Sequence, residues 1–259
     1  MKGEIIVSLD NPLVKEARSL NDKKFRRKLG KFLVDGKKLV YEVVCGAAEI
    51  DKIFVDSTKL DEMNYILEKF DGNIVPVTSK VMASISENDT PQGIIAEVFM
   101  NETPEFKPSS NEPILILDRI QDPGNLGTII RTAVATGFQT IVLIDTTDAF
   151  SPKVIRSSSG GIFYLDIFRM SENEIASFCK SHGISLLVAD MGGENIFEYK
   201  VQTKNFALVI GNEGQGVSDY FKENGKAISL PMKPVMESLN ASVSASVLMY
   251  VLVGKDINN

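Results

Sequence analysis

The sequence predicts an α/β protein of two domains, and three observations carry this prediction. Short apolar segments alternate with helical patterns along the 259 residues. Residues 100–113 hold three prolines and almost no apolar side chains, which is typical of a linker. The apolar segments after it are continuous runs, which favours strands buried on both faces of a parallel sheet. We expect a first domain at 1–100, a linker at 101–113 and a second domain at 114–259.

The first domain is expected to be a small α/β sandwich. A helix is predicted over 12–28, because Asn11 is a good cap and Pro12 suits the first helical position. The elements expected after it are a strand at 32–34, a helix at 37–44, strands at 53–55 and 74–77 around a helix at 60–70, a short helix from 79 and a strand at 94–99.

The second domain is expected to hold a parallel sheet covered by helices. Its predicted strands are 114–117, 141–144, 186–189, 207–210 and 227–230. In sheets of this kind a ligand binds outside the carboxyl ends of the strands.

Charge is distributed unevenly. The net charge of −6 argues against a protein that is basic throughout. Residues 15–38, however, contain ten Lys or Arg residues and only three acidic residues, so this segment is a candidate for contact with RNA phosphates. Its densest part holds Lys23, Lys24, Arg26, Arg27 and Lys28. A solvated helix face is an equally good interpretation of the segment in isolation.

Histidine and cysteine content excludes several kinds of site. His182 is the only histidine, which rules out a multi-histidine metal centre, and we expect it at the surface at a helix end. No metal is expected. Cys45 and Cys179 have no metal or redox spacing and are interpreted as free thiols in a reducing cytosol. No signal peptide or membrane span is expected, so the predicted location is cytoplasmic.

Two motifs run from a strand through a loop into a helix. In the first motif, residues 118–133, Asn125 and Arg131 stand out, although each alone could be a helix cap or an exposed helical side chain. The second motif, residues 208–218, has glycines that permit close approach of the backbone to a ligand. Its spacing is G-x-x-G-x-G, which argues against a nucleotide-dependent oxidoreductase, and a tight turn without ligand stays open.

The third motif comprises residues 228–232 and 237–245. Ser238 is the expected cap of the helix that follows. Ser238, Ser242 and Ser246 give this helix one face of small residues, and the rest is apolar. Such a helix is buried within the fold or against another subunit.

The order and spacing of the three motifs closely resemble the SpoU (TrmH) family of RNA ribose methyltransferases in the SPOUT superfamily. Residues 11–15 and 31–36 are similar to the L30e-like substrate-binding domain of many members, so the resemblance spans nearly the whole chain. Two positions depart from the family pattern. Pro234 stands where glycine is usual, which could reshape the loop for the methionine part of the cofactor, and Asp35 stands where glutamate is commoner.

The resemblance implies a carboxyl-terminal trefoil knot, a rare exception among protein topologies. It also implies S-adenosyl-L-methionine (SAM) as cofactor and a homodimer that uses the helix at 238–253. The residues implied in cofactor binding are Gly211, Leu230 and Leu239 around adenosine, Gly216 in the loop, and Asn240.

The implied reaction is methyl transfer to a ribose 2′-hydroxyl of RNA. Arg131 matches the arginine that the family assigns to activating this hydroxyl. A guanidinium stays charged and is a poor base, so two versions are open: direct activation, or anchoring of the adjacent phosphate. The resemblance gives Asn125, Glu213 and Asn240 the role of orienting Arg131 and the ribose, and Ser238 that of binding either. Glu213 as general base is the simpler chemical alternative.

The separate amino-terminal domain favours ribosomal RNA over transfer RNA as substrate. A non-catalytic RNA-binding protein with a decayed site is the alternative from another class. The intact Asn125, Arg131, Glu213 and Asn240 argue against it.

Overall fold

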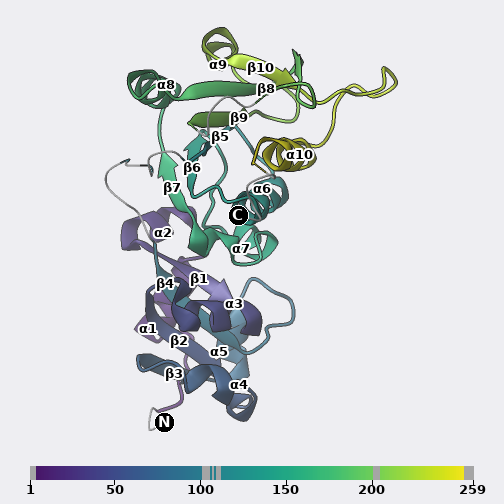
Figure 1. The fold of residues 1–259 in the computed structure, drawn as a ribbon. Coiled ribbons are helices and arrows are strands. Elements are labelled where there is room, and N and C mark those ends of the chain that lie inside the picture. Colours follow the sequence, from purple (N-terminus) through teal and green to yellow (C-terminus); the bar gives the residue numbers. More distant parts are fainter. Residues whose placement is uncertain (1–3, 101–105, 107, 109–111, 201–204, 254–259) are drawn as a thin grey trace. The chain divides into compact units, whose positions relative to one another are not determined.

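The chain folds into two compact units, each with its own sheet (Figure 1). The structure is a computed structural model that describes residues 4–100, 106, 108, 112–200 and 205–253. Unit 1 comprises Met1–Asn101 and Phe150–Phe163, and unit 2 comprises Glu102–Ala149 and Tyr164–Asn259. The predicted α/β class is confirmed in both. Most of the expected linker, residues 101–113, lies outside the described residues.

Unit 1 is built on a four-stranded mixed sheet in the order β1-β4-β2-β3. β4 (Ile94–Phe99) is antiparallel to both β1 (Lys31–Asp35) and β2 (Ile50–Asp56), and β2 is parallel to β3 (Asn73–Val77). Apolar side chains of α1 (Pro12–Ser19) and α5 (Ser79–Ile85) form one core with the sheet. The other helical elements are α3 (Lys37–Glu42), the π-helical turn η1 (Val43–Ala47) and α4 (Leu60–Leu67).

The single helix predicted over 12–28 is wrong, because the structure has two helices there. α1 ends at Ser19, and α2 (Lys23–Leu29) starts after Asp22, whose side chain accepts a hydrogen bond from the amide of Lys24 at 2.7 Å. Asn21 donates to the carbonyl of Ile85 at 3.0 Å, and Arg26 donates to the carbonyl of Leu20 at 2.7 Å. These contacts provide hydrogen-bond partners for polar groups between the two helices, including the carbonyl of Leu20 and the side chain of Asn21. The break is therefore stabilised by the contact with Ile85 of α5 and by the guanidinium of Arg26.

A later segment completes unit 1. Residues 150–163 include α7 (Pro152–Ser157) and most of the 3₁₀ turn η2 (Gly161–Tyr164). The rings of Phe150 and Phe163 lie 5.1 and 6.3 Å from that of Phe32, which is 2% exposed. Burial of Phe32 on β1 therefore depends on residues more than 100 positions away, and the boundary expected at residue 100 does not include them.

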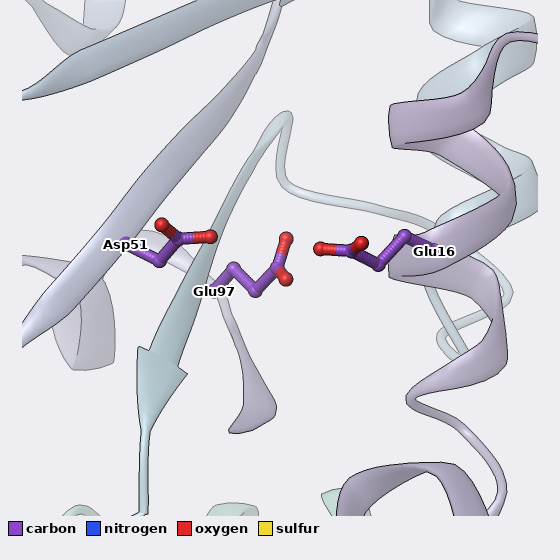
Figure 2. Close-up of side chains that lie close together, drawn as sticks. All are labelled: Glu16, Asp51 and Glu97. Atoms are coloured by element: carbon purple, nitrogen blue, oxygen red, sulfur yellow. The ribbon is translucent and has the colours of Figure 1, made fainter. Parts of the chain in front are cut away.

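Three carboxylates of unit 1 point toward one another (Figure 2): Glu16 on α1, Asp51 on β2 and Glu97 on β4. Lys31 contacts Asp51 at 2.7 Å and Glu16 at 3.3 Å, and Lys52 contacts Glu97 at 3.0 Å. Burial raises the pKa of Glu97. Burial also opposes ionisation of Glu16, but its side-chain contacts with Glu97 and Lys31 and the charges of Lys31 and Lys52 outweigh burial and lower the pKa of Glu16. The two ammonium groups supply the positive charge here, so the cluster is an ion-pair network.

Replacing Lys52 by Met should lower the free energy of unfolding by about 3–5 kcal/mol. The reason is that Glu97, whose side chain is 0% exposed, would keep its carboxyl without the closest buried cation. Urea unfolding followed by circular dichroism measures the change. Lys37→Met is the matched control: its ion pair with Glu62 lies at the surface, so its loss should cost at most about 1 kcal/mol. Equal effects of the two substitutions would contradict this account of the cluster.

Unit 2 contains a six-stranded sheet in the order β10-β8-β9-β5-β6-β7, and every pair is parallel. The expected strands are present, and β7 at one edge was not expected. The strands are β5 (Ile114–Asp118), β6 (Thr140–Ile144), β7 (Asp166–Arg169), β8 (Ser185–Asn195), β9 (Phe206–Ile210) and β10 (Lys226–Ser229).

Helices cover both faces of this sheet (Figure 1). α8 (Glu172–Ser181) and α9 (Asp219–Asn224) share a core with alternate residues of β5, β6 and β9. On the other face α6 (Pro123–Ala135) and α10 (Ala241–Val253) lie side by side, and the hydroxyls of Thr132 and Ser246 are 3.0 Å apart. Asn240 directly precedes α10.

The remaining sequence predictions concern single residues. His182 is exposed at the carboxyl end of α8, as expected. Both cysteines are free: Cys45 is exposed, and burial raises the pKa of the Cys179 thiol to about 11. Among the described residues no helix is long and apolar enough to span a membrane.

Candidate active site

A cavity of about 420 Å³ opens at the carboxyl ends of β9 and β10 in unit 2. This is the edge at which a parallel sheet binds ligands, as the sequence predicted. Its wall is formed by β8, by the loop after β9, by β10 and the chain after it, and by α10. The predicted site residues in the wall are Gly211, Glu213, Gly216, Leu230, Ser238 and Leu239.

The loop at 211–216, hereafter the glycine loop, closes on itself. The amide of Asn212 donates to the carbonyl of Gly216 at 3.1 Å, and the amide of Gly216 donates back at 2.9 Å. A Cβ on Gly211 would lie 2.3 Å from backbone atoms of Gly216 and Val217, so no larger residue fits there. Gly216 has φ +68°, which a glycine adopts without strain. The second motif thus encodes a compact loop on the cavity wall.

The glycine loop is fastened to the end of β5. The side chain of Asn212 accepts from the amide of Gly214 at 2.8 Å and donates to the carbonyl of Arg119 at 2.9 Å. The buried carboxylate of Asp118 accepts from the amide of Ser218 at 2.7 Å. No role for Asp118, Arg119 or Asn212 is predicted from the sequence, although all three lie within the first two motifs. Their importance depends on contacts between motifs almost 100 residues apart.

Three polar residues, one from each motif, form a hydrogen-bond chain. Asn240 donates to the side-chain oxygen of Asn125 at 3.0 Å, and Asn125 donates to Glu213 at 2.5 Å. Because Asn125 both accepts and donates, the orientation of its amide is fixed. The second carboxylate oxygen of Glu213 has no hydrogen-bond partner among the described residues, so it can accept a hydrogen bond or a proton from a hydroxyl group of a ligand.

Ser238 is not the helix cap that the sequence predicted. α10 begins at Ala241, and the side chain of Asn240 accepts from the amide of Ser242 at 2.9 Å and of Val243 at 3.4 Å. Asn240 therefore satisfies the first free amides of α10. It does not line the cavity. Ser238 does, and its side chain is free to contact a ligand there.

Within one chain Arg131 stands apart from these residues. It lies on α6, six positions after Asn125, which places the two side chains about 120° apart around the helix axis. The side chain of Arg131 is exposed, does not line the cavity, and has no hydrogen bond or ion pair among the described residues. Asn125 itself does not cap α6, because Asp122 accepts from the amide of Asn125 at 2.8 Å.

The charges on the wall suit a ligand with positive groups. Asp190, Glu213 and Glu237 contribute carboxylates, and Lys222 is the one cation among the described lining residues. Apolar side chains of Ile210, Leu230 and Leu248 provide surface for a flat ring. Pro234, the departure from the family pattern, is exposed and is not among the lining residues, whereas Met232 is.

Comparisons with known proteins agree with this geometry. Residues 112–250 match the model of the SpoU rRNA Methylase family, and residues 11–96 match the MRM3-like substrate binding domain. The 23S rRNA (guanosine(2553)-2'-O)-methyltransferase RlmP of Bacillus subtilis is 33% identical, with 96% of this chain and 99% of that protein covered.

Two solved structures share the fold. An rRNA methyltransferase from Sinorhizobium meliloti with bound AdoMet is 28% identical and superimposes with a TM-score of 0.86 over 98% of each chain. AviRb of Streptomyces viridochromogenes, a SpoU methyltransferase, is 23% identical, with a TM-score of 0.86 over 96% of this chain and 99% of its own, and shows the likeness of fold. The three motifs, the parallel sheet with a cavity at its carboxyl edge and the match over 112–250 lead to one conclusion: the chain belongs to the SpoU rRNA methylase family.

Proposed function

We propose that this protein transfers a methyl group from SAM to the ribose 2′-hydroxyl of a nucleotide in ribosomal RNA. One observation carries the proposal: Asn125, Glu213 and Asn240, which come from three separate motifs, form one hydrogen-bond chain that ends at the cavity wall. The family, and the activity named for the Bacillus subtilis relative, support the same reaction. Transfer RNA is the alternative substrate.

The cavity fits SAM in size and charge. Its volume of about 420 Å³ lies in the range of small-molecule sites. SAM carries a sulfonium, an ammonium and a carboxylate, which match the three acids and Lys222 of the wall. We assign Gly211, Leu230 and Leu239 to the adenosine and Gly216 to the shape of the loop. Asn240 contributes to the site indirectly, because its side chain holds that of Asn125 by a hydrogen bond. When bound, SAM supplies an activated methyl group.

Residues of the chain have to orient the hydroxyl and remove its proton. Glu213 can accept the hydroxyl proton at its free oxygen, while Asn125 holds the other oxygen in place. Ser238 is placed to bind the ribose. Arg131 has no partner among the described residues, so its guanidinium is available to an RNA phosphate or to the hydroxyl itself.

Radiolabelled methyl transfer tests the proposal. The protein is incubated with methyl-labelled SAM and either 23S rRNA or bulk transfer RNA, and the labelled nucleosides are identified by mass spectrometry. We expect a 2′-O-methylated nucleoside from the ribosomal RNA. Incorporation into a base, or none into any RNA, would overturn the assignment of ribose chemistry. Incorporation into transfer RNA alone would reverse the assignment of substrate.

Unit 1 carries the proposed RNA contact. Lys23, Lys24, Arg27 and Lys28 of α2 are exposed, whereas Arg26 is 3% exposed and bound to backbone carbonyls. Arg26 is thus withdrawn from the RNA-binding set that the sequence suggested, because its guanidinium is already used inside the unit. The other four are proposed to contact phosphates.

Neutralising Lys23 and Lys24 together as glutamines should weaken RNA binding and reduce the slope of log K against log salt by about 1–2. Each lysine that contacts a phosphate releases bound counterions, and the slope counts them. Binding assays at several salt concentrations measure it. The double variant of Lys69 and Lys80, also exposed lysines of unit 1, removes the same charge and should keep the wild-type slope. Equal slopes in both variants would mean that the basic residues of α2 form a solvated helix face that does not contact RNA phosphates.

We also propose a homodimer that forms through α10 and acts in the cytoplasm. Val243 and Tyr250 on α10 are 48% and 50% exposed, and Leu239 just before it is 38% exposed. An apolar surface of this kind is typical of an interface. Light scattering should give twice the chain mass, and Tyr250→Glu should give the monomer. A wild-type mass of one chain would contradict the proposal.

A further inference from the structure

Arg119 has a backbone conformation that is unusual for a residue with a side chain. Its φ of +59° lies in the left-handed region, where a Cβ is disfavoured. The backbone is held there from both sides: its amide donates to Ile144 at 2.8 Å, and its carbonyl accepts from Asn212 at 2.9 Å and Gln121 at 3.3 Å. Glycine would meet this conformation without strain, so the arginine side chain must offer something in return.

The guanidinium of Arg119 joins two parts of the site. It donates to both oxygens of Asp118, at 3.0 and 3.2 Å, and Asp118 is 0% exposed. The same group reaches the side-chain oxygen of Gln215 and the carbonyl of Gly216, both at 3.4 Å. Since Asp118 also accepts from the amide of Ser218, Arg119 and Asp118 together contact residues 215–218, the end of the glycine loop and the two residues after it, at three points.

We propose that Arg119 is a positioning residue for SAM, which holds residues 215–218 in the conformation that binds the cofactor. The inference rests on the proposed function, because it takes the glycine loop as part of the SAM site. A loop that is already ordered loses less conformational freedom when a ligand binds, so affinity is higher. Arg119 does not line the cavity, and it therefore acts through the loop and not by touching the cofactor.

The geometry explains why arginine is used. A planar fork can pair with both carboxylate oxygens of Asp118 and still direct N–H groups at Gln215 and Gly216. Lysine would keep the positive charge beside the buried carboxylate but could not make all of these contacts at once. Arg119→Lys thus separates the neutralisation of Asp118 from the fastening of the loop.

The first experiment measures SAM binding by calorimetry, the melting temperature, and the rate at saturating SAM. For Arg119→Lys we expect the Kd and the KM for SAM to be about tenfold higher than in the wild type, because one or two charged hydrogen bonds to the loop are lost. We expect kcat and the melting temperature to stay near the wild-type values. Arg169→Lys is the matched control, an arginine beside Asp148 at 3.7 Å that does not line the cavity, and should bind SAM as wild type does. Unchanged SAM affinity in Arg119→Lys would overturn the proposal.

A second pair of variants separates an effect on stability from an effect on SAM binding. Arg119→Gly relieves the backbone strain but leaves Asp118 buried without its cation, so its melting temperature should fall. Adding Asp118→Asn removes that charge and should restore the melting temperature, while SAM affinity stays at least about tenfold below wild type. If affinity recovers together with stability, Arg119 is only structural. Failure of the wild-type protein to bind SAM would instead reject the proposed function.

Discussion

Arg131→Ala should lower the rate of methyl transfer by about 10²–10⁴-fold and leave the affinity for SAM unchanged. The loss is expected to be large because Arg131 is the proposed group that acts on the hydroxyl or on the neighbouring phosphate. Affinity should be kept because the side chain is exposed on α6 and does not line the cavity. Single-turnover kinetics gives the rate, and calorimetry gives the affinity.

The same variant can separate the two versions of the mechanism. Once the methylated nucleotide is mapped, its adjacent phosphate can be replaced by an uncharged methylphosphonate. If Arg131 anchors that phosphate, the double change should slow the reaction no more than either change alone, because each removes the same interaction. If Arg131 acts on the hydroxyl, the two losses of rate should multiply, because the changes are independent. A rate within a few-fold of wild type for Arg131→Ala would exclude both versions and leave Glu213 as the acting group.

Gly211→Ala should raise the Kd for SAM by about 100-fold, which corresponds to about 2.7 kcal/mol, the upper part of the 1–3 kcal/mol that overpacking typically costs. The added Cβ would lie 2.3 Å from the backbone of Gly216 and Val217, and backbone atoms cannot turn aside as a side chain can. The glycine loop would have to open, and its hydrogen bonds between Asn212 and Gly216 would be lost. Calorimetry with SAM measures the effect.

Gly214→Ala is the matched control within the same loop. A Cβ there would meet only the side-chain oxygen of Asn212, at 3.6 Å, which is an ordinary contact. This variant should keep SAM affinity within a few-fold of wild type. Loss of binding in both variants would mean that the loop tolerates no change at all, and retention in Gly211→Ala would remove the glycine loop from the cofactor site.

Both predictions draw on motifs that could be read in the sequence, for a physical reason. Strands of a covered parallel sheet are continuous apolar runs, so β5, β6, β9 and β10 were expected within one or two residues. The ligand edge of such a sheet follows from strand direction alone. The glycines of the second motif then mark a loop that needs close backbone contact. Family, sheet and place of the cavity were therefore determined by local pattern.

Helix ends and surface roles were less accessible, because they depend on partners elsewhere in the chain. The break between α1 and α2 rests on Arg26 and on a contact with α5, and a run of basic residues does not show that one of them turns inward. Ser238 and Asn240 are both good caps by type, and the fold selects Asn240. β7 has only two apolar residues, Ile167 and Phe168, with a charged residue on each side, so it lacks an apolar run of the length that marks a strand.

The chemical groups of the site are encoded locally: the amides, carboxylates and guanidinium of the three motifs can be read from the sequence, and they identify the family. The connections between these groups come from the tertiary structure. It joined Asn125 to Glu213 and Asn240 across 88 and 115 positions, and it placed Arg119 in a left-handed conformation against the glycine loop. The reason is that such contacts arise when strands distant in sequence become neighbours in the sheet, and no local pattern records which of them will meet.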